Sequence, residues 1–171
     1  NINVWDLIKM ANRHPRVNIL TPGAGVGGHC IAVDPWFIVH SAPEQAKLIR
    51  TAREVNDFKP HWVLQKVLST VANHALHKPS IACFGLAFKP DIDDLRESPA
   101  LHITNKLADS YNGKVMAVEP NIHGTNKLHA NAELVSLEQG LTADIIVILV
   151  KHKAFNTVDF TGKTVINVVG E

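Results

Sequence analysis

Four short apolar runs in the second half of the chain constrain the fold more than any other feature. They occupy residues 80–85, 114–118, 144–150 and 163–169, and helical or polar stretches separate them. Continuous apolar character is typical of strands that are covered on both faces, and helices between such strands connect them in parallel. Residues 78–171 are therefore predicted to form a small α/β domain built on a parallel sheet.

The sequence also predicts two helices within this domain. One begins at Ser98-Pro99, with serine as the N-cap and proline at the first helical position, and runs to about Tyr111. The spacing of apolar residues in 134–141 indicates the second helix. Cys83 lies inside the first strand, where we expect a buried core side chain.

The region before this domain has a different pattern. Residues 4–14 carry apolar side chains at helical spacing, residues 16–35 are rich in glycine, and residues 44–76 are helical again. Pro60 is expected to kink this last span or to begin a second helix. We therefore expect residues 1–76 to form a region of helices and loops.

Composition excludes several classes of function. The chain has 171 residues, of which 46% are hydrophobic and 19% charged, as is typical of a globular protein. A net charge of +1 gives no general attraction to nucleic acid or to an anionic membrane. No apolar run approaches the roughly 20 residues that span a bilayer. Two cysteines do not suggest a disulfide scaffold. We expect no nucleic-acid partner, no membrane association and a cytoplasmic location.

A glycine-rich segment, TPGAGVGGHCIAVDP at residues 21–35, contains the GxGxxG letters of a dinucleotide-binding turn. Such a turn needs a strand before it, a helix N-terminus directly after it and an acidic residue about 20 positions on. Here His29-Cys30 and further loop residues follow the last glycine, and Arg50–Arg53 lie at the distance where the acid belongs. The segment is therefore not predicted to bind NAD.

Two interpretations of this segment remain open from the residues alone. It can be an ordinary connector with an inert, buried cysteine. Alternatively, Gly27 and Gly28 let backbone N–H groups approach a phosphate or an oxyanion, and Cys30 beside His29 acts as a nucleophile. A zinc site is not predicted, because neither CxxC nor HxxxH spacing occurs around Cys30.

Residues 84–99 cross from the first strand of the α/β domain to its first helix. In open α/β sheets, ligands bind at the carboxyl ends of strands near helix N-termini. Lys89 and Arg96 in this stretch can bind an anion, the arginine through two parallel hydrogen bonds. The alternative is that both are solvated charges paired with neighbouring carboxylates, namely Asp91, Asp93, Asp94 or Glu97.

Three ordered stretches resemble the UDP-glucose/GDP-mannose dehydrogenase family. Residues 27–34, GGHCIAVD, are similar to its GGxCxxxD catalytic segment, and residues 52–57, AREVND, to the ARxxND segment of its central helix. Residues 84–100 are similar to its GLxFK…DxRxSPA segment, and 118–120, VEP, to a further element. Residues 12–20 resemble the branch of the family that oxidises UDP-N-acetyl-D-mannosamine.

The resemblance implies a C-terminal fragment. Residues 1–76 would be a helical remnant of the central domain, and residues 78–171 a small Rossmann-like, parallel-sheet domain that binds the UDP-sugar. NAD, the implied cofactor, would be bound mainly by a missing N-terminal domain, so we expect the isolated chain to be inactive. The resemblance also implies a homodimer formed through the central helices.

The resemblance also implies a reaction, the oxidation of the sugar C6 alcohol to a carboxylate by two hydride transfers through a cysteine thiohemiacetal and thioester. Cys30 would be the nucleophile and Asp34 would help to activate water. Lys89 would contact UDP-N-acetyl-D-mannosamine or a related nucleotide-sugar, and Arg96 would lie near the cofactor. Three glycines would line the substrate: Gly25, Gly27 and Gly28. A non-catalytic nucleotide-sugar-binding or oligomerisation module is the alternative.

Overall fold

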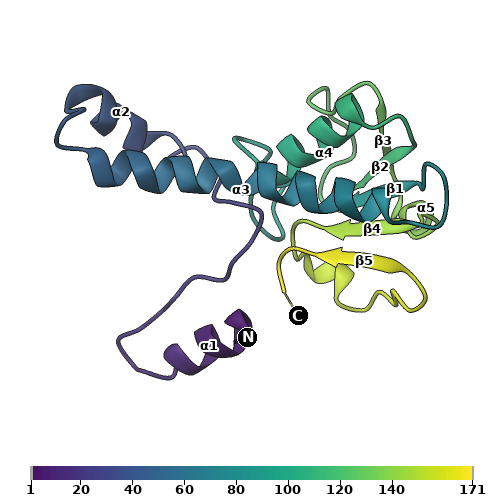
Figure 1. The fold of residues 1–171 in the computed structure, drawn as a ribbon, viewed down its shortest axis with the longest axis horizontal. Helices are drawn as coiled ribbons and strands as arrows, with labels where there is room; N and C mark the ends of the chain where they lie inside the picture. The colour runs from purple at the N-terminus through teal and green to yellow at the C-terminus, as the bar shows by residue number, and fades with distance from the viewer. Residues whose placement is uncertain (1, 171) are drawn as a thin grey trace.

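The computed structural model describes residues 2–170 and contains a five-stranded parallel sheet with the strand order β3-β2-β1-β4-β5 (Figure 1). Each neighbouring pair of strands is parallel. The predicted parallel α/β fold is therefore confirmed. The strands are β1 (Ile81–Phe84), β2 (Val115–Val118), β3 (Ala132–Val135), β4 (Ile145–Ile148) and β5 (Thr164–Asn167).

The order of the strands fixes where a ligand site belongs. β1 lies in the middle of the sheet and pairs with both β2 and β4, so that Phe84 is level with Val118 and Ile148. The chain winds first toward β3 and then, from β4, toward β5. A crevice opens between the carboxyl ends of β1 and β4 at such a change of direction.

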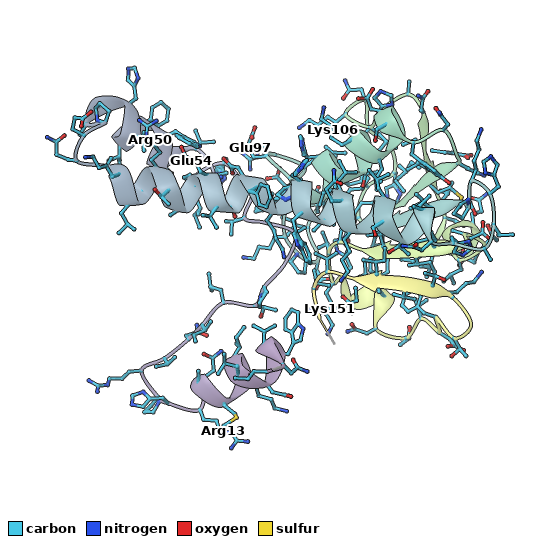
Figure 2. All side chains as sticks on the ribbon, in the orientation of Figure 1. Arg13, Arg50, Glu54, Glu97, Lys106 and Lys151 are labelled. Carbon is cyan, nitrogen blue, oxygen red and sulfur yellow. The ribbon has the colours of Figure 1, made fainter. Side chains whose placement is uncertain are left out.

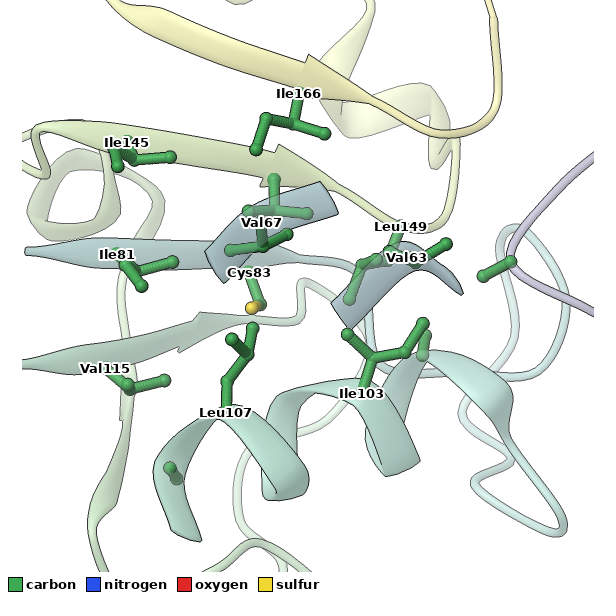
Figure 3. Close-up of a cluster of buried hydrophobic side chains, with 14 of the residues drawn as sticks. Val63, Val67, Ile81, Cys83, Ile103, Leu107, Val115, Ile145, Leu149 and Ile166 are labelled. Atoms are coloured by element: carbon green, nitrogen blue, oxygen red, sulfur yellow. The ribbon is translucent and has the colours of Figure 1, made fainter. Parts of the chain in front are cut away.

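Two helices cover one face of the sheet. The second half of α3 (Lys47–Ala72) and all of α4 (Pro99–Ser110) pack on it, and Figure 3 shows Cys83 between Val67 of α3 and Leu107 of α4. Cys83 is fully buried, as the sequence predicts. Burial raises the pKa of its thiol to about 12, so this cysteine is chemically inert at neutral pH.

The other face is covered by α5 (Leu137–Gly140) and the 3-10 helix η1 (Lys153–Phe155). Phe84 of β1 packs edge-on against Phe155 and Phe160, with ring centroids 5.2 and 5.7 Å apart. Alternate residues of each central strand therefore face two separate apolar layers, which explains the unbroken apolar runs in the sequence.

Helix α3 excludes one of the two alternatives predicted for Pro60, a second helix that begins there. It is one helix of 26 residues that continues through the buried Pro60, so no second helix begins there. Its first half extends beyond the sheet and packs against α2 (Asp34–Ser41) (Figure 1). The second half packs on the sheet through Val63 and Val67.

Residues 134–141 also differ from the prediction, which made them a single helix. The structure has strand β3 up to Val135, and α5 begins after Ser136, which forms a capping box with Gln139. β3 is an edge strand, and Glu133 within it is exposed. The strand therefore lacks the apolar run that identifies the central strands.

The N-terminal helix α1 (Val4–Ala11) lies beside the C-terminal end of the chain (Figure 1), and it ends earlier than the predicted residue 14. The side chain of Asn12 bonds both the N–H and the C=O of Ile19, which turns the chain back. Side chains of this segment project around their own ribbon with few neighbours (Figure 2). Over residues 2–170, no helix is both long and apolar enough to cross a membrane.

Candidate functional site

Two loops meet at the carboxyl edge of the sheet. We call residues 21–30 the glycine loop and residues 85–98, which lead from β1 to α4, the crossing loop. The N–H of Gly28 donates to the carbonyl of Arg96 at 3.1 Å. A Cβ on Gly27 would collide with the carbonyl oxygen of Glu97 and would lie 2.9 Å from the Cβ of Phe88. The glycines therefore let the two loops touch backbone to backbone.

Backbone conformation also requires two of these glycines. Gly25 and Gly28 have φ values of +136° and +96°, which side chains of L-residues rarely allow. The ring of Phe88 lies over Gly28, 3.1 Å from the position of a Cβ. Gly27 and Gly28 are buried against the crossing loop, whereas Gly25 is half-buried.

A cavity of about 360 Å³ lies where the crevice between β1 and β4 was expected. We call it the carboxyl-edge cavity. It is lined by the glycine loop from Thr21 to Gly25, by the start of the crossing loop, and by residues 149–151 after β4. Phe88 and Pro90 both line it, and the exposed Lys89 stands between them. Its volume and its place in the fold suit a small-molecule ligand.

A second cavity, of about 390 Å³, lies on the opposite side of the glycine loop, between α3 and α4. We call it the helix-side cavity, and Val26, Arg53, Asn56 and His102 line it. It is slightly larger, but it opens on helix sides rather than at strand ends. The carboxyl-edge cavity is therefore the better candidate for a nucleotide.

Cys30 is the last residue of the glycine loop and is exposed to solvent. Its carbonyl accepts hydrogen bonds from the N–H groups of Val33 and Asp34, at 3.0 and 2.8 Å, in the turn that starts α2. Asp34, the first residue of α2, is exposed as well. An exposed thiol contradicts the interpretation of Cys30 as a buried, inert residue.

Arg96 pairs with Asp94 at the rim of the site. Its Nε and Nη2 atoms donate to Asp94 Oδ2 at 2.8 and 2.6 Å. Hydrogen bonding from Arg96 lowers the pKa of Asp94 to about 2, and bonding to Asp94 raises the pKa of Arg96. His29 adds a smaller contribution to the lowered pKa of Asp94, and Cys30 adds one to the raised pKa of Arg96.

A buried carboxylate–histidine pair, which the sequence did not single out, holds the start of the crossing loop. Glu119 and His152 have fully buried side chains, with Glu119 Oε2 3.1 Å from His152 Nε2. The same oxygen accepts from the N–H groups of Leu86 and Ala87, at 2.7 and 3.0 Å. His152 Nδ1 accepts from the N–H of Asp91 at 2.9 Å, so Nε2 carries the proton that Glu119 accepts.

These bonds keep Glu119 ionised. Burial raises the pKa of its carboxyl group, but hydrogen bonds from His152 and from the backbone outweigh that effect, and the pKa is lowered overall. An acid at the end of the second strand would bind a ribose in a dinucleotide fold. Here it binds the protein's own loop.

The glycine loop does not offer a fitting site for the NAD pyrophosphate. The helix after the glycine loop begins only at Asp34, and the N–H of Gly28 already bonds Arg96. Pyrophosphate binding requires free N–H groups at a helix N-terminus. Between residues 2 and 170, no group of three or more histidine, cysteine and acidic side chains is arranged to hold a metal ion.

Comparison with known proteins shows to which family the chain belongs. Residues 82–167 match the UDP-binding domain of the UDP-glucose/GDP-mannose dehydrogenase family, and residues 1–58 match its central domain. The chain belongs to this family. The resemblance predicted from the motifs is thereby confirmed.

Two curated relatives are UDP-N-acetyl-D-mannosamine dehydrogenases. The chain is 57% identical to that of Escherichia coli K12 over 166 residues, covering 92% of the chain and 40% of the relative. It is 59% identical to that of Campylobacter jejuni over 161 residues, covering 91% and 39%. The solved UDP-D-ManNAc dehydrogenase of Pyrococcus horikoshii is 36% identical, with a TM-score of 0.81 over 99% of this chain and 41% of that one. The chain spans about 40% of the length of these relatives.

Proposed function

We propose that this chain is the nucleophile-bearing and nucleotide-sugar-binding part of an NAD-dependent dehydrogenase. The substrate proposed is UDP-N-acetyl-D-mannosamine, which is oxidised at C6 to UDP-N-acetyl-D-mannosaminuronate. The observation that carries the proposal is the exposed thiol of Cys30, at the junction of two loops that border the carboxyl-edge cavity. The names of the relatives support the choice of sugar.

The overall reaction takes one alcohol, one water and two NAD⁺ to one carboxylate, two NADH and three protons. The first oxidation removes a hydride from C6 and a proton from its hydroxyl group, which gives an aldehyde. The Cys30 thiolate then adds to the aldehyde carbon, and a proton on the oxygen completes a thiohemiacetal. Loss of a second hydride from that carbon and of the hydroxyl proton gives a thioester, and water displaces the thiol.

The neighbours of Cys30 have roles that suit this sequence. The guanidinium of Arg96 would stabilise negative charge on the sulfur and on the aldehyde oxygen, and it would lie near a bound NAD, as the family resemblance implies. Asp34, at the start of α2 one turn after Cys30, orients the water that hydrolyses the thioester. Lys89 binds the diphosphate at the cavity rim, where Gly25 allows a close approach.

The proposal extends to assembly and location. The first half of α3 exposes Leu48, Val55 and Phe58, which are 82%, 68% and 60% accessible. Apolar side chains of this size, gathered on one helix, suit a homodimer interface. A nucleotide-sugar substrate and a reduced thiol nucleophile both suit a cytoplasmic enzyme.

The test is the Cys30→Ser variant of the full-length dehydrogenase that this proposal requires. NADH absorbance and uronate formation are measured with UDP-N-acetyl-D-mannosamine. Uronate formation is expected to fall at least about a thousandfold, because the covalent step is lost. The buried Cys83→Ser variant serves as the control and should retain turnover. Uronate formation at the wild-type rate by Cys30→Ser would favour the non-catalytic binding module instead.

A further inference from the structure

The side chain of Asn56, on α3, forms hydrogen bonds with the backbone of the glycine loop. The N–H of Val26 donates to Asn56 Oδ1 at 2.8 Å, and Asn56 Nδ2 donates to the carbonyl of Val26 at 3.3 Å. The two residues are thirty positions apart in the chain. A single amide thus satisfies both polar groups of one loop residue, as a neighbouring strand would.

The neighbours of Asn56 fix which way its amide points. Asp57 Oδ1 accepts from Asn56 Nδ2 at 3.1 Å and from Arg53 Nη2 at 2.8 Å. An acceptor-only carboxylate on that side requires the amide nitrogen to face it, so the amide oxygen faces the N–H of Val26. Arg53 is only 8% exposed, and its buried position keeps the Arg53–Asp57 pair in place.

Pro60, one turn further along the helix, leaves the backbone carbonyl of Asn56 without its usual helical hydrogen bond. Proline has no N–H, so it cannot bond the carbonyl of Asn56 four residues before it. That carbonyl oxygen lies 3.6 Å from where a Cβ on Gly25 would be. The backbone and the side chain of Asn56 therefore both face the glycine loop.

We infer that Asn56 is a positioning residue that places the Cys30 thiol by fixing the backbone of Val26. The inference rests on the proposed function of Cys30. From Val26 to Gly28 the loop has one further hydrogen bond to the rest of the protein, from Gly28 to the Arg96 carbonyl, and Cys30 is bound through its carbonyl to the start of α2. Gly27 and Gly28 have no side chains with which to anchor the stretch between them. Without the amide, the stretch that leads to Cys30 keeps only the Gly28 hydrogen bond and its packing against the crossing loop.

A displaced thiol affects one part of the reaction more than the rest. Addition to the aldehyde needs the sulfur in a near-attack position, whereas the first hydride transfer does not involve the sulfur. A loosened glycine loop therefore slows the capture of the aldehyde, and part of the aldehyde escapes after one oxidation. The ratio of NADH to uronate then rises above two.

The experiment compares Asn56→Ala with Asn73→Ala in the full-length dehydrogenase. Asn73 is the C-cap of the same helix, where its amide bonds Ser69. NADH, uronate and aldehyde trapped by a hydroxylamine reagent are measured with UDP-N-acetyl-D-mannosamine. Asn56→Ala is expected to lower kcat for uronate at least about tenfold, to raise the NADH-to-uronate ratio above two and to release aldehyde. Asn73→Ala should keep both the rate and the ratio.

A charge-matched pair of variants tests the assigned bonds. Asn56→Asp keeps an acceptor for the Val26 N–H but sets two carboxylates side by side at positions 56 and 57. The double variant with Asp57→Asn restores a donor next to that acceptor, and it should recover part of the loss. If Asn56→Asp lost activity only because the protein was destabilised, a second substitution would not be expected to restore that activity. Thermal unfolding of each variant measures the destabilisation separately.

The outcomes separate the two ideas. An unchanged NADH-to-uronate ratio in Asn56→Ala overturns the positioning role, whether or not kcat falls. If Cys30→Ser still forms uronate, the proposed function itself fails, whatever Asn56→Ala does. If Cys30→Ser is inactive and Asn56→Ala keeps the wild-type ratio, only the role of Asn56 is wrong.

Discussion

The two loops that border the candidate site are held in opposite ways. The crossing loop is held from inside the sheet domain by Glu119 and His152, whose side chains are fully buried. The glycine loop is held from outside, by the half-buried Asn56 of α3 and by one backbone bond to Arg96. The shape of the crossing loop is therefore coupled to the folding of the domain, whereas that of the glycine loop is coupled to α3.

The two loops also differ in backbone strain. The crossing loop contains Asp91 and Glu97 with φ values of +60° and +46°, a conformation that costs non-glycine residues about 1–3 kcal/mol each. Asp91 is kept there by bonds to His152 and to the N–H of Lys153. In the glycine loop, positive φ occurs only at glycines, where it costs little. The strained loop is the one with the buried anchor.

The largest effect is expected from Glu119→Ala. The change leaves the N–H groups of Leu86 and Ala87 and the ring N–H of His152 buried without an acceptor. We expect a loss of about 3–5 kcal/mol in the free energy of unfolding, measured by urea denaturation of the chain. Glu133→Ala, at an exposed site on β3, should change it by less than about 0.5 kcal/mol. Equal effects of the two variants would show that Glu119 is no anchor.

The lowered pKa of Glu119 predicts that the free energy of unfolding depends on pH. Because folding lowers the pKa of Glu119, its ionised form adds stability at pH values above the ordinary value of 4.5. That contribution is lost as the pH falls through the lowered pKa. Urea denaturation at a series of pH values should therefore show a smaller acid-induced loss of stability in Glu119→Ala than in the wild type.

A smaller effect on folding is expected from Gly27→Ala, which acts on the contact between the loops. The added methyl group collides with Glu97 and Phe88, and overpacking of this kind costs about 1–3 kcal/mol if the contact is kept. The weakly held glycine loop can instead lift away. We expect faster amide hydrogen exchange over residues 21–30, with a smaller fall in stability than in Glu119→Ala.

The matched control for this prediction is Gly124→Ala. No heavy atom lies within 4 Å of the position of a Cβ on Gly124, so the same change in composition meets no neighbour. It should leave hydrogen exchange over residues 21–30 unchanged. If Gly27→Ala behaves like the control, the two loops are not packed as described.

The sequence predicts the parts of the fold whose cause is local. β1, β2 and β4 are buried along their whole length and are evident as apolar runs. Ser98 caps α4 as its sequence indicates, with its side chain accepting from Leu101. The edge strand β3 was missed because its pairing with β2, rather than its own pattern, makes it a strand.

In the candidate site, too, the sequence predicts only the features that have a local cause. The motifs direct attention to Cys30 and the crossing loop, and Arg96 is paired with Asp94, as one of its two interpretations expected. The need for glycine at position 27 arises from a residue seventy positions later, Glu97. Glu119 and His152 are thirty-three positions apart, and no spacing rule connects them. Contacts between distant loops decide these roles.

The smallest effect is expected from Asp94→Asn, at a half-buried position of the crossing loop. Folding lowers the pKa of Asp94 from 3.8 to about 2, so its pair with Arg96 is complete above pH 3.8 and is lost as the pH falls toward 2. Arg96 is exposed and Asp94 is half-buried, and ion pairs near the surface contribute only about 0–1 kcal/mol at neutral pH. We therefore expect the free energy of unfolding to fall by less than about 1 kcal/mol.

The charge beside Cys30 changes even though the fold does not. Without the Asp94 carboxylate, the guanidinium of Arg96 attracts anions more strongly toward the thiol. The ratio of Cys30 alkylation rates by iodoacetate, an anion, and iodoacetamide, a neutral reagent, should rise about twofold to threefold in Asp94→Asn. Asp93→Asn removes the same charge from an exposed neighbouring position and should raise this ratio less. Equal ratios in the two variants would mean that Arg96 does not act on the thiol, and that the crossing loop contributes only its backbone to the site.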